Sequence, residues 1–237
     1  MAVQENEVYY SVIDLRVRLR FVTGVSNPLS FHHQVSKEQL KRIIRASKPH
    51  FKALPTYEGT SLGLFGRVAL GLDCDEMYPN LFVGDMSTAL CKPYLRKLGI
   101  THVFNAAEGN FEGMVNSNGA YYNDIGVQYM GIPLVDHSSS SLCQYFLTSA
   151  QFIDDAIRGA GKEMHLLFTA FIYTGKVLVH CVNGYSRSPA ITVAYLAIKV
   201  NMPVPMALKL CCAARKICPN DGFLNQLAIL GNTLSNC

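Results

Sequence analysis

From Met77 onward, short runs of apolar and β-branched residues alternate with longer stretches of helical periodicity. Strands separated by helices favour an α/β fold, in which a mostly parallel central sheet is flanked by helices. In such sheets, ligands bind beyond the carboxyl ends of the strands, so the loops there are the first places to look for a site. Strands are predicted at residues 80–83, 100–104, 127–134 and 176–179, and helices at 87–98, 142–157, 190–200, 204–217 and 223–234.

The first 73 residues are predicted to form an extension of the main domain, which spans residues 74–237. Residues 1–34 show no sustained hydrophobic period. A short helix is predicted near residues 36–46, because Ser36 is followed three residues later by Gln39, which is the spacing of a capping box.

Composition and charge exclude several function classes. The 237 residues carry 21 basic and 17 acidic side chains, and the net charge of +4 is too weak to indicate nucleic-acid binding. The longest apolar stretch, near residues 164–173, has about ten residues, whereas a membrane-spanning helix needs roughly 18 or more. No signal peptide is visible, so the eight cysteines are interpreted as reduced thiols and the expected location is the cytoplasm or nucleus.

The strand predicted at 176–179 runs into the segment His-Cys-Val-Asn-Gly-Tyr-Ser-Arg-Ser-Pro at 180–189, and a helix follows. A loop in this position can turn its N–H groups inward as a nest for an anion, and the helix N-terminus adds unpaired donors and a positive dipole end. Gly184 permits the tight turn, and Arg187 offers a fork of donors to two phosphoryl oxygens. The segment therefore predicts a phosphate site.

Cys181 lies at the start of this loop, beside the predicted helix N-terminus and Arg187. Both features lower the pKa of a thiol, which reaches about 3.5–7.5 in such environments. A thiol of this kind is largely ionised at neutral pH and can attack phosphorus. The alternative is a buried structural cysteine, but the pattern His-Cys-x5-Arg-Ser on a strand, loop and helix favours a nucleophile.

Several motifs in chain order resemble those of one family. The loop at 180–188 resembles the signature of the cysteine-dependent protein tyrosine phosphatase superfamily. The segments YPNLFVG (78–84), GITHVFNAA (99–107), YSRSP (185–189) and PNDGF (219–223) are similar to those of its small atypical dual-specificity phosphatases. The resemblance covers about residues 75–234, and weakly 36–46. It implies a protein tyrosine phosphatase-like fold and a catalytic domain over 74–237. No metal or other cofactor is expected.

The resemblance also implies roles for the loop residues. Cys181 matches the nucleophile that forms a phosphocysteine intermediate, Arg187 the phosphate-binding arginine, and Ser188 the hydroxyl that stabilises the thiolate as it leaves. His180 matches a residue that orients the loop, and an ordinary core histidine is an equally good interpretation. The N–H groups expected to bind phosphate belong to Val182, Asn183, Gly184, Tyr185, Ser186 and Arg187.

The reaction also needs a proton donor, because the alkoxide of a serine, threonine or tyrosine is a poor leaving group. Asp136 follows a predicted strand and lies ten residues before Phe146, a spacing that matches the general-acid aspartate of the family. A capping or turn aspartate is the alternative, since a run of serines follows it.

Three residues near the C-terminus are weaker candidates for supporting roles. Asn220 would brace the loop and Asp221 would contact the substrate backbone, or each is simply a turn residue. Arg215 would rim the cleft and attract a second phosphate, or it is a solvated helix charge. The basic residues of the helix near 36–46 are interpreted as a solvated face.

The leading hypothesis is an enzyme that hydrolyses phosphotyrosine and phosphoserine or phosphothreonine in proteins. The family resemblance makes mitogen-activated protein kinases candidate substrates. No nucleic-acid or membrane partner is expected. The apparent inserts near 58–73 and 161–174 depart from the family pattern and keep a second hypothesis open, a catalytically impaired pseudophosphatase that binds phosphoproteins. A phosphoinositide phosphatase ranks low, because residues 182–186 contain no lysine.

Overall fold

The computed structural model describes residues 34–50, 54, 71–159 and 175–236. The apparent insert near 161–174 and most of that near 58–73 lie outside the described residues, as do residues 1–33. Within the described ranges, no helix combines the length and the apolar character that crossing a membrane requires.

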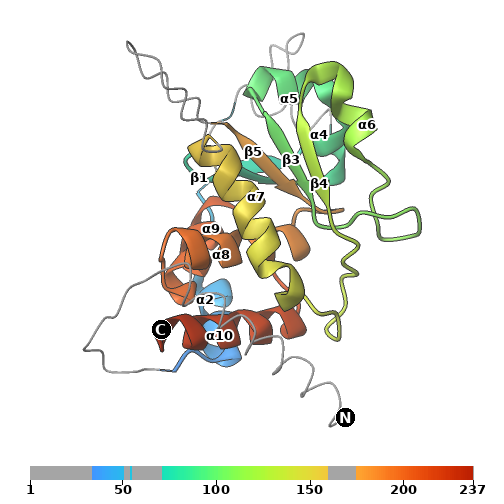
Figure 1. Ribbon diagram of the computed structural model, residues 1–237. Coiled ribbons are helices and arrows are strands. Elements are labelled where there is room, and N and C mark those ends of the chain that lie inside the picture. Colours follow the sequence, from blue (N-terminus) through green and yellow to red (C-terminus); the bar gives the residue numbers. More distant parts are fainter. Residues whose placement is uncertain (1–33, 51–53, 55–70, 160–174, 237) are drawn as a thin grey trace, which may run out of the picture.

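Five strands form one sheet in the order β1-β2-β5-β3-β4 (Figure 1). The strands are β1 (Cys74–Tyr78), β2 (Leu81–Gly84), β3 (His102–Asn105), β4 (Gln128–Gly131) and β5 (Val177–His180). β1 is antiparallel to β2, and the other neighbouring pairs are parallel. The predicted α/β fold with a mostly parallel sheet is therefore confirmed. The sequence does not reveal the edge strand β1, because Cys-Asp-Glu-Met-Tyr holds two acidic residues and no β-branched one.

The sheet separates two hydrophobic cores, because successive side chains of a strand point to opposite faces. Val177 and Val179 of β5 are buried in one core, and Leu178 is buried in the other. The first core is covered by α7 (Phe146–Arg158), α8 (Arg187–Lys199), α9 (Val204–Ala214) and α10 (Asp221–Ser235), and the second by α4 (Met86–Leu90), α5 (Lys92–Leu98) and α6 (Gly119–Tyr122). Two short 3₁₀ turns, η1 (Asn123–Ile125) and η2 (Cys143–Tyr145), complete the connections.

The single helix predicted over 87–98 is wrong, because two helices, α4 and α5, meet at Cys91. Pro93 lies in the first turn of α5. A proline is tolerated there, but inside a continuous helix it would remove a hydrogen bond and clash with the preceding turn. The remaining predicted helices occur, with α8 beginning at Arg187, three residues before the predicted start.

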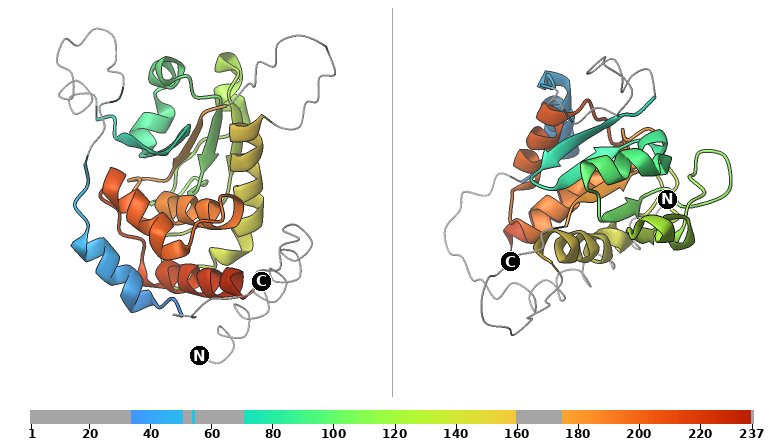
Figure 2. Two further views of the ribbon diagram at one scale, coloured as in Figure 1. Left: turned by 90° about the vertical axis from the view of Figure 1, so that its left-hand side faces the viewer. Right: turned by 90° about the horizontal axis from the view of Figure 1, so that it is seen from above.

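The N-terminal helix α2 (Lys37–Ala46) packs against α9 and α10 (Figure 2). Its first turn forms as predicted, since Ser36 Oγ accepts the Gln39 N–H at 3.2 Å. Leu40 is fully buried in the core that α2 shares with α9 and α10. The backbone of Val35 exchanges two hydrogen bonds with the Asn232 side chain, at 2.7 and 2.9 Å. This part of the extension is therefore integrated into the main domain.

Candidate active site

The carboxyl end of β5 and the N-terminus of α8 hold the predicted phosphate loop. Cys181 directly follows β5, and α8 begins at Arg187. The chain turns at Gly184, whose φ of +63° lies in the left-handed region that favours glycine. A Cβ atom there would lie 2.6 Å from the Gly84 carbonyl oxygen at the end of β2, so only glycine fits. Because α8 is buried along most of its length, the loop rests on a rigid base.

The sulfur of Cys181 faces hydrogen-bond donors from the loop and from α8. Ser188 Oγ lies 3.3 Å from Cys181 Sγ, and the backbone N–H groups of Ser188 and Tyr185 also donate to the sulfur. Burial by itself raises the pKa of Cys181, but these hydrogen bonds and the positive charge of Arg187 outweigh it, so the pKa is lowered. In α9, by contrast, burial raises the pKa of Cys212 to about 11.

Arg187 is buried, and its guanidinium is anchored by groups from two other loops. Nη1 donates to the carbonyl oxygens of Gly113 at 2.9 Å and Leu134 at 3.1 Å, and lies 3.5 Å from Met114 Sδ. Nε has no hydrogen-bond partner among the described residues and lies 3.7 Å from Asp136 Oδ2. An unpaired buried donor is costly unless a ligand uses it, so this N–H suits an incoming oxyanion.

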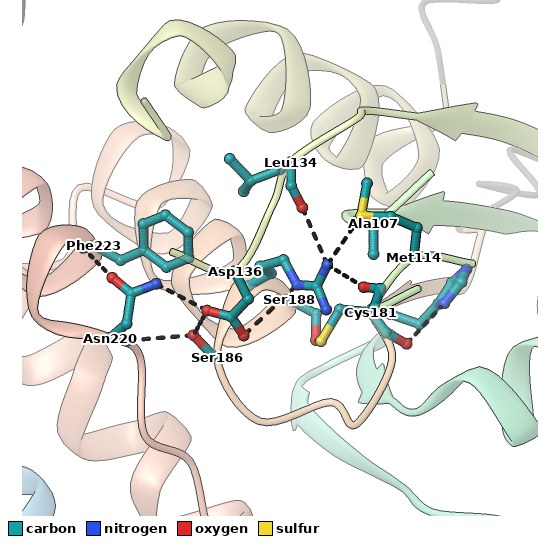
Figure 3. A network of polar contacts seen from close by, with 12 residues as sticks. Ala107, Met114, Leu134, Asp136, Cys181, Ser186, Ser188, Asn220 and Phe223 are labelled. Atoms are coloured by element: carbon teal, nitrogen blue, oxygen red, sulfur yellow. Dashed lines mark hydrogen bonds and ion pairs between the residues drawn. The ribbon is translucent and has the colours of Figure 1, made fainter. Parts of the chain in front are cut away.

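Asp136 lies beside the loop and is held by donors from two elements (Figure 3). Its Oδ1 accepts hydrogen bonds from Ser186 Oγ at 2.7 Å and from Asn220 Nδ2 at 2.8 Å. Asn220 is itself fixed as the cap of α10, because its Oδ1 accepts the Phe223 N–H at 3.0 Å. The side chain of Asp136 is 35% exposed, so its second oxygen stays within reach of a ligand. Asn220 therefore contacts both the phosphate loop and the predicted acid.

His180 is completely buried at the end of β5. Its Nδ1 lies 3.3 Å from the Cys181 carbonyl oxygen, and its Nε2 has no hydrogen-bond partner among the described residues. Burial, aided by the charge of Arg187, lowers the pKa of His180 to about 4. The imidazole is therefore neutral at physiological pH.

The structure buries Arg215, contrary to both expectations for it, and pairs Asp221 with the N-terminal helix α2. Arg215 is only 4% exposed and is enclosed by carboxylates and backbone carbonyls, so it neither rims the cleft nor forms a solvated charge. The carboxylate of Asp221 pairs with Lys41 at 2.6 Å and Lys37 at 3.7 Å on α2. The lysines of α2 thus serve a helix contact, which the interpretation of a solvated face overlooked.

The other loop residues differ in accessibility. Asn183 is exposed and Tyr185 is 39% exposed, whereas Gly184 and Ser186 are buried and Val182 is half-buried.

The sequence does not predict the groups that anchor Arg187, because the carbonyls of Gly113 and Leu134 belong to the backbone, and any residue type provides a carbonyl. Among the described residues, no group of three or more His, Cys, Asp or Glu side chains could hold a metal ion.

Comparison with known proteins relates the chain to one family. Residues 81–233 match the family model described as dual specificity phosphatase, catalytic domain. The chain is 39% identical to human dual specificity protein phosphatase 13B over 181 residues, which cover 76% of this chain and 84% of that protein. The mouse protein of the same name is 39% identical over 168 residues, 71% of this chain and 77% of that protein.

A solved structure shares the fold. Human DUSP28 superposes with a TM-score of 0.54 at 23% identity, covering 68% of this chain and 95% of that one. The sequence motifs suggest a particular likeness to dual specificity protein phosphatase 3, which these relatives do not support. The match over most of the described domain and the 39% identity establish the coarser relationship: the chain belongs to the dual specificity phosphatase family.

Proposed function

We propose that this chain is a protein phosphatase that hydrolyses phosphotyrosine and phosphoserine or phosphothreonine through a phosphocysteine intermediate. The proposal rests on the surroundings of Cys181 Sγ. A serine hydroxyl at 3.3 Å, two backbone N–H groups and the positive charge of Arg187 favour the thiolate form of this cysteine. Thiolate is the form that attacks phosphorus.

In the first step, the phosphate group would bind over the loop, with its oxygens on the loop N–H groups and on Arg187 Nε. The Cys181 thiolate attacks phosphorus, an S–P bond forms, and the P–O bond to the substrate breaks. Asp136, carrying its proton on Oδ2 because Oδ1 already accepts two hydrogen bonds, donates that proton to the leaving oxygen. The products of this step are the free alcohol or phenol and a phosphocysteine.

In the second step, Asp136 is a carboxylate and accepts a proton from a water molecule, which attacks phosphorus. The S–P bond breaks and inorganic phosphate forms. The Ser188 hydroxyl, which donates to Cys181 Sγ, stabilises the sulfur as it regains its negative charge. The proton that Asp136 has taken returns it to the state needed for the next cycle.

Phosphoproteins are the proposed substrates, and the resemblance makes mitogen-activated protein kinases the first to test. The proposed site of action is the cytoplasm or nucleus. The second candidate is a pseudophosphatase that binds phosphoproteins without turnover. The hydrogen bonds to Cys181 and Asp136 favour the enzyme, because a pure binding module would need neither an ionised thiol nor a held carboxylic acid.

The decisive experiment is steady-state dephosphorylation of matched phosphotyrosine and phosphothreonine peptides. Cys181→Ser is expected to abolish release of phosphate while the peptides still bind, because the oxygen nucleophile is far less ionised than the thiolate. Cys91→Ser, between α4 and α5 on the far face of the sheet, is the control and is expected to keep wild-type rates. Binding of phosphopeptides by wild-type protein without phosphate release would instead favour the pseudophosphatase.

A further inference from the structure

Arg215 directly follows α9, and all five of its guanidinium N–H donors are engaged inside the protein. Nη1 donates to Asp73 Oδ1 at 2.7 Å and Asp75 Oδ2 at 2.9 Å. Nη2 donates to Asp73 Oδ2 at 2.5 Å and to the Asn183 carbonyl at 3.2 Å, and Nε donates to the Gly184 carbonyl at 2.8 Å. Asp73 directly precedes β1 and Asp75 lies within it, so three distant segments meet at the outer side of the phosphate loop.

The two carbonyls that Arg215 binds belong to the phosphate loop itself. In a trans peptide, the C=O and the N–H of one peptide group point in opposite directions. The Gly184 carbonyl and the Tyr185 N–H form one such group, with the carbonyl on Arg215 and the N–H on the Cys181 sulfur. One planar peptide group thus links the Arg215 guanidinium to the Cys181 sulfur, with a hydrogen bond on each side.

We propose that Arg215 is a positioning residue for the nucleophile: its guanidinium holds the Gly184–Tyr185 peptide in the orientation that directs the Tyr185 N–H at Cys181 Sγ. This inference rests on the proposed function, in which Cys181 attacks phosphorus. Asp73 and Asp75 hold the guanidinium through the fork geometry that arginine offers to carboxylates. The start of the edge strand β1 therefore has a function, because Asp75 in the strand and Asp73 just before it are the acceptors that fix Arg215.

The contact also strengthens the donor. A cation on a carbonyl oxygen polarises the peptide, and hydrogen bonds in a chain reinforce one another in a buried environment. The Tyr185 N–H becomes a better donor to a negatively charged sulfur for this reason. Gly184 allows the arrangement, since a Cβ there would lie 2.9 Å from Arg215 Nη2.

The test is the pKa of Cys181, measured as the pH dependence of its alkylation by iodoacetamide, with the labelled peptide identified by mass spectrometry. In Arg215→Lys the positive charge stays, but one ammonium group cannot hold both aspartates and the Gly184 carbonyl in a fixed fork. The other ionisable groups around the loop, Arg187, Asp136 and His180, are unchanged. We expect the pKa of Cys181 to rise by about one unit, so that its alkylation profile moves to higher pH and its alkylation rate well below the wild-type midpoint falls roughly tenfold.

Arg158→Lys is the matched control, because Arg158 also pairs with an aspartate, Asp154 at 2.8 Å, but lies at the end of α7. It is expected to leave the alkylation profile unchanged. A folded Arg215→Lys protein with a lower Tm and a wild-type alkylation profile would overturn the proposal, since a purely structural role predicts that result. Absence of turnover in wild-type protein would contradict the proposed function, whereas the alkylation shift is measured without any substrate.

A second measurement needs no substitution of Arg215. In the NMR spectrum of the wild-type protein, the Tyr185 amide proton is expected to shift with pH at the same midpoint as the alkylation of Cys181. A Tyr185 amide that does not respond to the ionisation of Cys181 would overturn the proposal, even if Arg215→Lys fails to fold.

Discussion

Asp136 is held in place by hydrogen bonds that leave it able to donate a proton. Both donors, Ser186 and Asn220, bind the same oxygen, and the other oxygen stays available for a proton. Asp136→Asn keeps an Oδ1 acceptor for both donors and removes only the acidic proton. We expect kcat for phenyl phosphate, which has a poor leaving group, to fall by roughly 10²–10⁴-fold. The measurement is steady-state kinetics at constant pH.

A second substrate separates the loss of the proton from a general disturbance of the site. With p-nitrophenyl phosphate, whose leaving group is a weaker base, the loss in kcat from Asp136→Asn is expected to be much smaller. Asp155→Asn, an exposed substitution on α7, serves as the control and is expected to be neutral. Equal losses on the two substrates would mean that Asp136 does not supply the proton.

At the scale of residues, the sequence predicts the side chains whose residue type is itself required for the proposed reaction. Cys181, Arg187 and Ser188 lie within one short segment, so their proximity follows from local structure. The carbonyls that anchor Arg187 could not be predicted, because any residue provides one. The surroundings of Arg215 also could not be predicted, because its burial depends on Asp73 and Asp75, about 140 positions away in the chain.

At the scale of elements, the loop between β3 and α6 delivers the Gly113 carbonyl to Arg187. Asn105, at the end of β3, donates to the Val115 carbonyl at 3.0 Å, and Tyr129 of β4 donates to the Ser117 carbonyl at 2.8 Å. Burial raises the pKa of Tyr129 to about 12, so its hydroxyl keeps its proton at neutral pH. The two strands therefore fix the stretch of the loop that directly follows Gly113.

Tyr129→Phe removes the donor to the Ser117 carbonyl with little change of shape. We expect the free energy of unfolding in urea to fall by about 1–3 kcal/mol, because a buried acceptor loses its partner. We also expect KM for phosphopeptides to rise, because Gly113 no longer holds Arg187 in a fixed position.

Tyr121→Phe is the matched control for Tyr129→Phe. Its hydroxyl donates to the Leu90 carbonyl at the end of α4 at 2.6 Å, and not to the loop that carries Gly113. It is expected to lower stability similarly and to leave KM unchanged. A wild-type KM in Tyr129→Phe would show that the loop positions Arg187 without this hydrogen bond.

Helices and strands with a clear hydrophobic period could be predicted from the sequence. Those that depend on contacts with other segments or on a single residue could not. β5 is apolar and β-branched and is followed by the loop and a helix, so a buried strand at this point of the chain could be predicted from the sequence. In the sheet that the structure describes, β1 is an edge strand paired with β2. Its two acidic residues make side-chain contacts, Asp75 with Arg215 and Glu76 with the Asn80 N–H, and so hide the strand pattern. The break between α4 and α5 depends on Pro93, whose effect a hydrophobic period alone does not register.

At the scale of the whole molecule, the core extends beyond the matched family domain. The family match begins at residue 81, yet α2 packs on α9 and α10 and buries Leu40 completely. α10 also carries Asn220 at its start, which binds Asp136. The N-terminal helix therefore supports the helix that holds the proposed acid.

Leu40→Ala tests whether α2 unfolds together with the catalytic domain. Removing a fully buried leucine side chain is expected to lower the free energy of unfolding by about 2–5 kcal/mol in a single cooperative urea transition. Because α2 packs on α9 and α10, whereas Cys181 and Arg187 stand at β5 and α8, kcat of the folded variant is expected to stay at the wild-type value. Lys41→Ala, which removes only a partly exposed ion pair with Asp221, is expected to cost at most about 1 kcal/mol. If both variants lose equally little stability, or if Leu40→Ala unfolds in two separate transitions, α2 is an appendage that folds independently of the catalytic core.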